Sequence, residues 1–160
     1  MANQIQHSQV VHASLAPTWS AISRMGAVQD WHPNVARSQV LTDHDSGIGA
    51  SRRVEFQDGN SVVETVVEES ESGYTTMEMS EMPLLDNAFV TIRITERSDD
   101  ETEVTFSIDY RLRYGPLGWL INALMMKRML RKAFETALAG LSHHLETGDL
   151  IADSVPAPTP

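Results

Sequence analysis

The stretch that decides the fold runs from Thr102 to Glu146 and reads TEVTFSIDYRLRYGPLGWLINALMMKRMLRKAFETALAGLSHHLE. Its first part alternates apolar and polar side chains, and this period of two predicts a β-strand with one apolar face. A strand of this kind is typical of an antiparallel sheet that is covered on one side. The apolar face carries Val104, Phe106, Ile108, Tyr110 and Leu112.

The second part of the stretch changes to helical spacing. After Gly115-Pro116-Leu117-Gly118, apolar side chains recur at mixed helical intervals, through Leu124 and Phe134 to Leu145. We expect one helix over residues 117–146, about 45 Å long at 1.5 Å per residue. Its apolar face has to be buried, and the apolar face of the sheet is the available partner. A bent sheet and a straight helix leave a gap between them, which predicts a ligand cavity.

The residues before this stretch add more strands and two short helical segments. Residues 4–14 read as a strand, residues 16–25 as a short helix, and residues 27–31 as a further helical turn that ends at His32-Pro33. Strands after that, followed by one long helix, indicate an α+β fold with a curved antiparallel sheet of about seven strands. The remaining strand candidates are residues 35–43, 52–56, 62–68, 74–81 and 89–97, with a turn expected at Asp86-Asn87 before the last of them.

Composition narrows the class of protein. The chain has 160 residues, 41% hydrophobic residues and no cysteine, so we expect one domain over 1–148, a disordered tail over 149–160 and no thiolate chemistry. The formal net charge of −10 argues against a nucleic-acid partner. No apolar run is long enough for an integral membrane segment. We expect a cytoplasmic monomer or homodimer.

One hairpin has a predictable register. Asp58-Gly59 is a strong turn signal, and a three-residue loop over 57–59 would place Arg52 opposite Glu64. This register also collects Val54, Phe56, Val62 and Val66 on one face, which burial favours. The Arg52–Glu64 pair would then share the apolar face. It is either a partly buried ion pair that sets the strand register or a polar anchor for a ligand, with Glu64 as a general base.

The order of these features resembles the START/Bet v 1-like superfamily, and within it the polyketide cyclase/dehydrase-like branch of the SRPBCC group. The resemblance covers about residues 5–146. It implies a helix-grip fold and a hydrophobic ligand class, and no particular activity. The stretches that carry it are residues 31–35 (WHPNV), 47–52 (GIGASR), Asp58-Gly59 with Glu64, Tyr74, residues 81–84 (EMPL) and residues 102–106 (TEVTF), where relatives often have an aromatic residue at the position of Phe106.

The candidate site follows from these positions. Glu64 and His32 are the candidate catalytic residues, His32 because its ordinary pKa suits proton transfer near neutral pH. Each of these residues also has an explanation that involves no chemistry. Glu64 would belong to a structural ion pair, His32 would be a surface residue, and Trp31 beside it would be a core residue. For the strand over 74–81, periodicity leaves open whether the tyrosine set or the methionine set faces inward. The candidate ligand-binding residues are Trp31, Arg52, Phe56, Tyr74, Phe106, Tyr110 and Leu124.

Three functions compete on this basis. The chain is a carrier of a small hydrophobic molecule, or a cyclase, aromatase or dehydratase that uses Arg52, Glu64 and His32 or Tyr110, or an interaction module without a ligand. No histidine and carboxylate set has metal-ligand spacing, and we expect no cofactor. Lys127, Arg128, Arg131 and Lys132 cluster on the long helix. They form either a solvated helix face or a contact for an anionic ligand or membrane surface.

Overall fold

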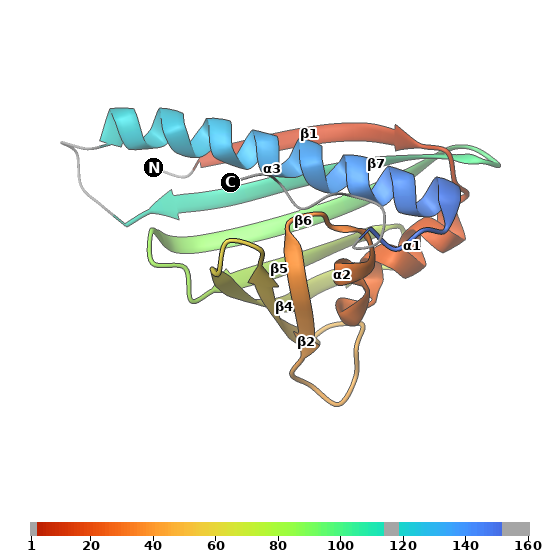
Figure 1. Cartoon of the computed structure of the whole chain (residues 1–160), viewed down its shortest axis with the longest axis horizontal. Coiled ribbons are helices and arrows are strands. Elements are labelled where there is room, and N and C mark those ends of the chain that lie inside the picture. The colour runs from red at the N-terminus through yellow and green to blue at the C-terminus, as the bar shows by residue number, and fades with distance from the viewer. Residues whose placement is uncertain (1–2, 114–118, 152–160) are drawn as a thin grey trace.

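A computed structural model describes residues 3–113 and 119–151, with the side chains of 119–122 left out. The chain begins with β1 (Asn3–Val11) and continues through three short helical segments, seven strands in all and one long helix (Figure 1). The elements after β1 are α1 (Leu15–Ser23), η1 (Met25–Ala27), α2 (Val28–Trp31), β2 (Val35–Val40), β3 (Ser51–Phe56), β4 (Ser61–Ser70), β5 (Tyr74–Ser80), β6 (Leu85–Ser98), β7 (Glu101–Leu112) and α3 (Trp119–Thr147).

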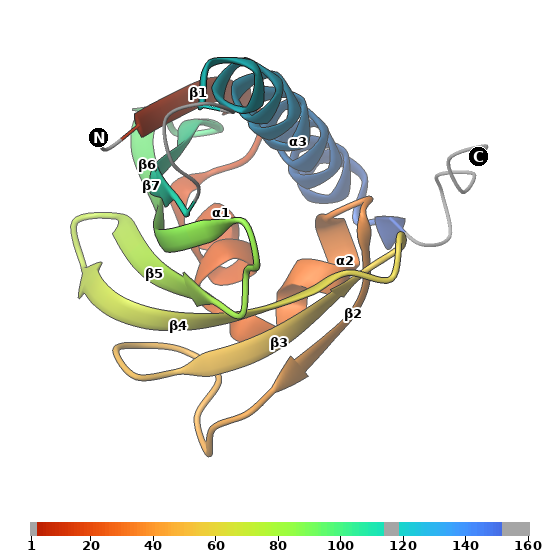
Figure 2. The same cartoon turned by 90° about the vertical axis from the view of Figure 1, so that its left-hand side faces the viewer.

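The strands form one antiparallel sheet in the order β1-β7-β6-β5-β4-β3-β2. The sheet curls around α3, and the segment of α1 and α2 lies at one end of the curl (Figure 2). The predicted α+β fold is confirmed: a curved seven-stranded sheet is wrapped on a long C-terminal helix, with short helices after the first strand. We call the end with α1 and α2 the closed end. The opposite end, with residues 81–84 between β5 and β6 and the first turns of α3, is the open end (Figures 1 and 2).

The β3–β4 hairpin has the predicted three-residue loop. Gly59 has a φ of 90°, a left-handed conformation that glycine adopts without steric cost. The amide of Phe56 donates to the carbonyl oxygen of Asn60 at 2.8 Å. Arg52 therefore pairs with Glu64 and Val54 with Val62, as the grouping of apolar residues predicted. Arg52 and Glu64 are both buried on the inner face of the sheet.

Strand β6 begins earlier than the sequence indicated. Asp86 and Asn87 suggested a turn before a strand at residue 89, but β6 starts at Leu85 and pairs with β7 from there. The register shifts between Leu85 and Asn87, which is where a bulge lets polar residues lie within a strand. Ala88 consequently belongs to the sheet and is buried.

Helix α3 covers the sheet most closely in its second half. Phe134, Ala137, Leu138 and Leu141 are buried there. Gly140 lies so close to α2 and the loop after it that a Cβ atom would come within 2.2 Å of the Trp31 carbonyl oxygen. Only a residue without a side chain permits this contact, so Gly140 fixes the distance between α3 and the short helices.

The packed part of the chain extends to Ile151. After α3, the amide of Gly148 donates to the carbonyl oxygen of His144 at 2.8 Å, and His144 Nδ1 donates to the carbonyl oxygen of Asp149 at 2.7 Å. Ile151 is 4% exposed. Of the expected tail, residues 152–160 lie outside the described residues, as do residues 117 and 118 at the expected start of the helix.

Candidate functional site

One row of inward-facing residues crosses five strands of the sheet. The cross-strand register places Glu64 opposite both Arg52 and Met79, Met79 opposite Ala88, and Ala88 opposite Tyr110. With about 4.8 Å between neighbouring strands, the row spans about 19 Å along the curved sheet. The next inward row toward the closed end is entirely apolar. It consists of Val66, Met77, Val90, Ile108 and Ile5.

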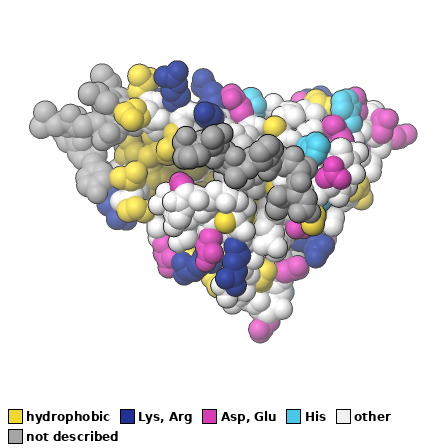
Figure 3. Space-filling view, in the orientation of Figure 1, with side chains coloured by type: hydrophobic (Ala, Val, Ile, Leu, Met, Phe, Trp, Pro, Cys, Tyr) yellow, Lys and Arg dark blue, Asp and Glu magenta, His cyan; other side chains and the backbone are white. Residues whose placement is uncertain are grey.

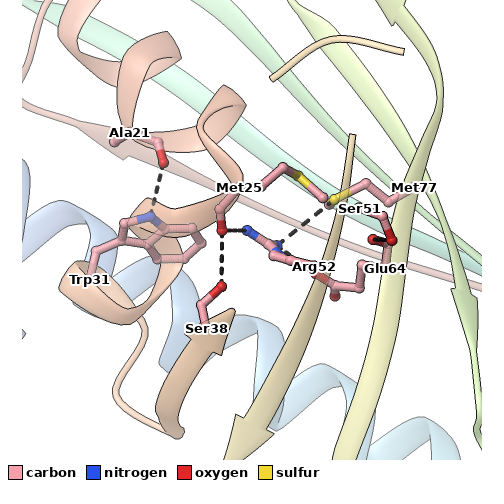
Figure 4. Close-up of polar contacts among 8 residues, drawn as sticks. All are labelled: Ala21, Met25, Trp31, Ser38, Ser51, Arg52, Glu64 and Met77. Atoms are coloured by element: carbon pink, nitrogen blue, oxygen red, sulfur yellow. Dashed lines mark hydrogen bonds and ion pairs between the residues drawn. The ribbon is translucent and has the colours of Figure 1, made fainter. Parts of the chain in front are cut away.

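The β3–β4 end of the row is a buried ion pair. Arg52 donates to Glu64 Oε2 from Nε at 2.6 Å and lies with Nη2 at 2.5 Å from the same oxygen. Its Nη1 donates to the carbonyl oxygen of Met25 in η1 at 2.9 Å, and Ser38 donates to that oxygen as well (Figure 4). Since each nitrogen of Arg52 has a partner, the guanidinium links β3, β4 and η1 and fixes the sheet against the short helices.

The β7 end of the row carries a phenol. Tyr110 is 2% exposed, and its hydroxyl finds no hydrogen-bond partner among the described residues. A buried hydroxyl without a partner costs about 1–3 kcal/mol, so this position calls for an acceptor. Burial raises the pKa of Tyr110, which keeps the hydroxyl protonated as a donor. Its cross-strand neighbour Ala88 has the smallest side chain of the row and is itself buried.

An aromatic chain follows the closed end of the interior. Trp31 is buried, donates from Nε1 to the carbonyl oxygen of Ala21 at 3.1 Å, and contacts the edge of Phe106 at a centroid distance of 6.2 Å. Phe106 in turn contacts Phe134 of α3 at 5.7 Å. The rings join α2, β7 and α3, so the indole and Phe106 form a packed wall of the interior.

His32 lies between the rings of Trp31 and Phe56. Its imidazole stacks on Trp31 at 5.8 Å and meets the edge of Phe56 at 6.5 Å, while Nδ1 accepts from the amide of Asn34 at 3.2 Å. Burial, and then the charge of Arg52, lowers the pKa of His32 to about 4. The imidazole is therefore neutral at pH 7 and a weak base, which disfavours the proton-transfer role expected of it.

Two of the expected ligand-binding residues lie away from the inner face. On β5, Thr75 and Met77 are buried, so the methionine set faces inward and Tyr74 faces outward. The Tyr74 hydroxyl donates to Glu68 Oε1 at 2.5 Å, and Arg93 lies over its ring. Leu124 on α3 is 73% exposed. The structure thus joins His32, Trp31, Phe56 and Phe106 through ring contacts and Arg52 with Glu64 through the ion pair. Tyr110 lies apart from them, at the other end of the row.

A groove of about 520 Å³ lies at the open end. Met79 and Leu85 line its apolar part, and Met79 is itself a member of the polar row. The ion pairs Arg53–Glu81 and Arg113–Asp86, at 2.7 and 3.2 Å, hold its rim. The groove therefore reaches Met79, one member of the row that ends at Tyr110.

Met79 and Ala88 are site residues that sequence reasoning missed. The direction of Met79 could not be predicted, because either the tyrosine set or the methionine set of its strand could face inward. Ala88 was missed because the polar pair before it was taken as a turn. The inward position of Glu64 is the signal that could have found them, since each residue opposite it across the sheet shares its face.

Neither a metal site nor a spanning helix is found within the described ranges. No three histidine or acidic side chains there lie close enough to hold a metal ion. In residues 3–113 and 119–151, no helix is both long and apolar enough to cross a membrane.

Comparison with known families gives one match along nearly the whole chain. A family model described as "Polyketide cyclase / dehydrase and lipid transport" matches residues 3–146. No curated protein matches the sequence.

Solved structures match the fold at low identity. A START superfamily protein from Mycobacterium smegmatis is 17% identical with a TM-score of 0.73, over 89% of this chain and 97% of that one. Major latex-like protein 151 from Panax ginseng is 13% identical with a TM-score of 0.70, over 90% and 97%. The di-domain ARO/CYC BexL of the BE-7585A biosynthetic pathway is 13% identical with a TM-score of 0.76, over 90% of this chain and 46% of that one.

Proposed function

The chain belongs to the polyketide cyclase/dehydrase and lipid transport family, and on that premise we propose that it holds a small, largely apolar molecule between the sheet and α3. The observation that carries the proposal is the buried Tyr110 hydroxyl, which lacks a hydrogen-bond partner among the described residues and lies on an inner face that is mostly apolar apart from the Arg52–Glu64 pair. A ligand with a carbonyl or hydroxyl oxygen would accept from it. The apolar body of the ligand would lie along Ala88 and Met79, toward the groove at the open end.

The ion pair at the other end of the row fits a structural role in shaping the site better than a role in catalysis. Arg52 and Glu64 already satisfy each other, and Arg52 also binds a backbone carbonyl. A ligand therefore gains no free charge there, and a molecule without a formal charge suits the interior best. In this proposal Trp31, Phe56 and Phe106 are packing walls, and the protein acts in the cytoplasm as a monomer or homodimer.

The experiment is native mass spectrometry of the protein as purified, followed by solvent extraction of any bound compound. The protein is then titrated with 9-fluorenone, an uncharged tricyclic aromatic ketone. Tyr110→Phe removes only the hydroxyl and is expected to weaken binding about two- to tenfold, the worth of one hydrogen bond. Ala88→Leu puts a larger side chain beside the phenol, where this proposal places the ligand, and is expected to abolish the complex.

Tyr74→Phe is the matched control, because it removes a hydroxyl from the outer face of the same sheet. It is expected to bind like the wild type. A wild-type protein that carries no compound and binds neither this probe nor a fatty acid would contradict the proposal. Equal binding by Ala88→Leu would also contradict it, because the ligand would then lie elsewhere.

A second candidate function is a cyclase or dehydratase activity on a polyketide-like ketone. Its support is that a phenol and a carboxylate, Tyr110 and Glu64, lie in one row of the inner face. Tyr110 would donate to the developing enolate oxygen, as a preorganised donor in a dry site. The test is turnover of a poly-β-ketone substrate, with kcat reduced in Tyr110→Phe while KM stays within about twofold of the wild type.

A further inference from the structure

A second surface lies outside the interior, at the open end. Three of the most exposed large apolar side chains of the described chain are there on α3: Leu124 (73%), Met125 (66%) and Met129 (58%). The segment between β5 and β6, which carries Leu84 with 49% exposure, lies at the same end (Figures 1 and 2). Hydrophobic side chains gather at this end in the space-filling view (Figure 3). Exposed apolar side chains in such a group mark a contact surface.

Four cations follow Leu124 and Met125 along the same helix, and Met129 lies among them. Lys127, Arg128, Arg131 and Lys132 are exposed, and none forms an ion pair with any described residue. Together with Leu124 and Glu135 they line a hollow of the surface. Glu135 is the only acid among residues 119–135, in a chain whose formal net charge is −10. This segment is therefore positive where the rest of the protein is negative.

The order of the apolar side chains and the cations along the helix axis fits the boundary between the acyl chains and the phosphates of a lipid bilayer. Arg128 and Lys132 come four and eight residues after Leu124, about 6 and 12 Å farther from the open end at 1.5 Å per residue. Apolar side chains of peripheral proteins enter a bilayer by about 5–10 Å. Leu124 and Met125 at that depth would leave the cations at the level of the lipid phosphates.

The acids of the open end do not oppose this arrangement. Glu81 and Asp86 are paired with Arg53 and Arg113, which leaves Glu78 as the unpaired acid of the groove. Charges farther away are screened over about 8 Å at physiological ionic strength. A nucleic acid would use the cations but would have no use for exposed leucine and methionine side chains.

We propose that the open end docks on an anionic lipid surface, with Leu124 and Met125 at the acyl boundary and the four cations at the phosphates. The groove at the open end, which reaches Met79, then opens onto lipid. This inference goes beyond ligand binding, because the docking surface is complete without any molecule in the interior.

The test is sedimentation of the full chain with vesicles of phosphatidylcholine alone and with about 30 mol% phosphatidylserine. Binding is expected only with phosphatidylserine and is expected to fall at high salt. One cation near such a surface contributes about fivefold to binding. Arg128→Glu with Lys132→Glu is therefore expected to lower binding at least about twentyfold. Arg24→Glu with Arg37→Glu makes the same charge change at exposed positions away from the open end and is expected to lower it much less.

A second pair of variants separates the apolar part. Leu124→Ser with Met125→Ser is expected to abolish binding, while Ile48→Ser, at a residue 65% exposed in a distant loop, leaves it unchanged. All these positions are exposed, so folding is retained and is checked by thermal unfolding. The charge-reversed variant still yields any compound extracted from the wild type, which separates docking from ligand binding.

Three results would overturn the proposal. The first is no sedimentation with anionic vesicles, and the second is equal loss of binding in the matched control variants. The third is a wild-type dimer that dissociates in Leu124→Ser with Met125→Ser, because a second copy of the chain would then be the partner of this surface.

Discussion

The closed and open ends of the molecule use the same helix in different ways. At the closed end, the second half of α3 buries Leu138 and Leu141 completely and contacts α2 through Gly140. At the open end, the first half of α3 leaves Leu124 and Met125 mostly in solvent, beside a groove. One element is thus a core helix over part of its length and an exposed apolar surface over the rest.

We expect this difference to divide two properties between the ends: the closed end stabilises the fold, and the open end gives a ligand access to the interior. Regions with many buried apolar contacts open only with the whole fold, whereas regions with few such contacts open locally at low cost. The closed end has the ring contacts, the Gly140 contact and the link from Arg52 to η1. We therefore expect substitutions at the closed end to change the free energy of unfolding, and those at the open end to change binding.

Breaking the Arg52–Glu64 pair should have the largest effect. Glu64→Gln leaves a buried guanidinium without its counter-charge, which costs about 3–5 kcal/mol. The measurement is urea unfolding at pH 7, with Glu78→Gln, an exposed position on β5, as the control. The double variant Arg52→Met with Glu64→Leu removes both charges and should recover most of this loss. A stable Glu64→Gln protein would mean that the pair does not hold the closed end.

Gly140→Ala should come next. In an exposed helix interior this change stabilises by about 1 kcal/mol, but here the new methyl would meet the Trp31 carbonyl oxygen at 2.2 Å and Pro33 Cδ at 2.6 Å. The backbone has to move apart, and we expect a loss of about 3 kcal/mol. Ala139→Ser, one residue earlier on an exposed position, serves as the control in the same thermal unfolding experiment. A gain in stability on Gly140→Ala would show that α3 is not held this close to α2.

His32 should make the closed end sensitive to acid. The unfolded chain protonates this imidazole near its ordinary pKa of 6.5, whereas in the folded protein the pKa is lowered to about 4. Between these values the unfolded state binds more protons, so stability falls as the pH falls from about 6.5 to about 4. We expect His32 to account for about 3 kcal/mol of this loss.

The measurement is urea unfolding between pH 7 and pH 4 for the wild type and His32→Asn. Because both proteins share the same carboxylates, the difference between their curves reports His32. A difference that is independent of pH would mean that the imidazole titrates normally in the folded protein.

The smallest effect on stability is expected at the open end. Leu124→Ser with Met125→Ser should change the free energy of unfolding by less than about 0.5 kcal/mol per residue, since both side chains are already exposed. Leu138→Ser, on the buried part of the same helix, is the contrast and should be severely destabilising. A large loss at Leu124 and Met125 would erase the distinction between the two ends.

Several features of the fold could be predicted from local pattern. The period-two alternation in β7, the helical spacing in α3 and the turn signal at Asp58-Gly59 each reflect physics that acts over a few residues. The register of Arg52 against Glu64 followed as well, because grouping apolar residues on one face leaves few alternatives.

The element order, the apolar face of the last strand and the position of the buried pair therefore follow from the amino-acid pattern alone. Three further features follow from the packing of the whole fold: the methionine side of β5 faces inward, Ala88 lies beside Tyr110, and His32 packs between Trp31 and Phe56. Those outcomes depend on strand pairing and on how the sheet curls around α3. The burial that lowers the pKa of His32 comes from residues distant in sequence, and no local pattern contains that information.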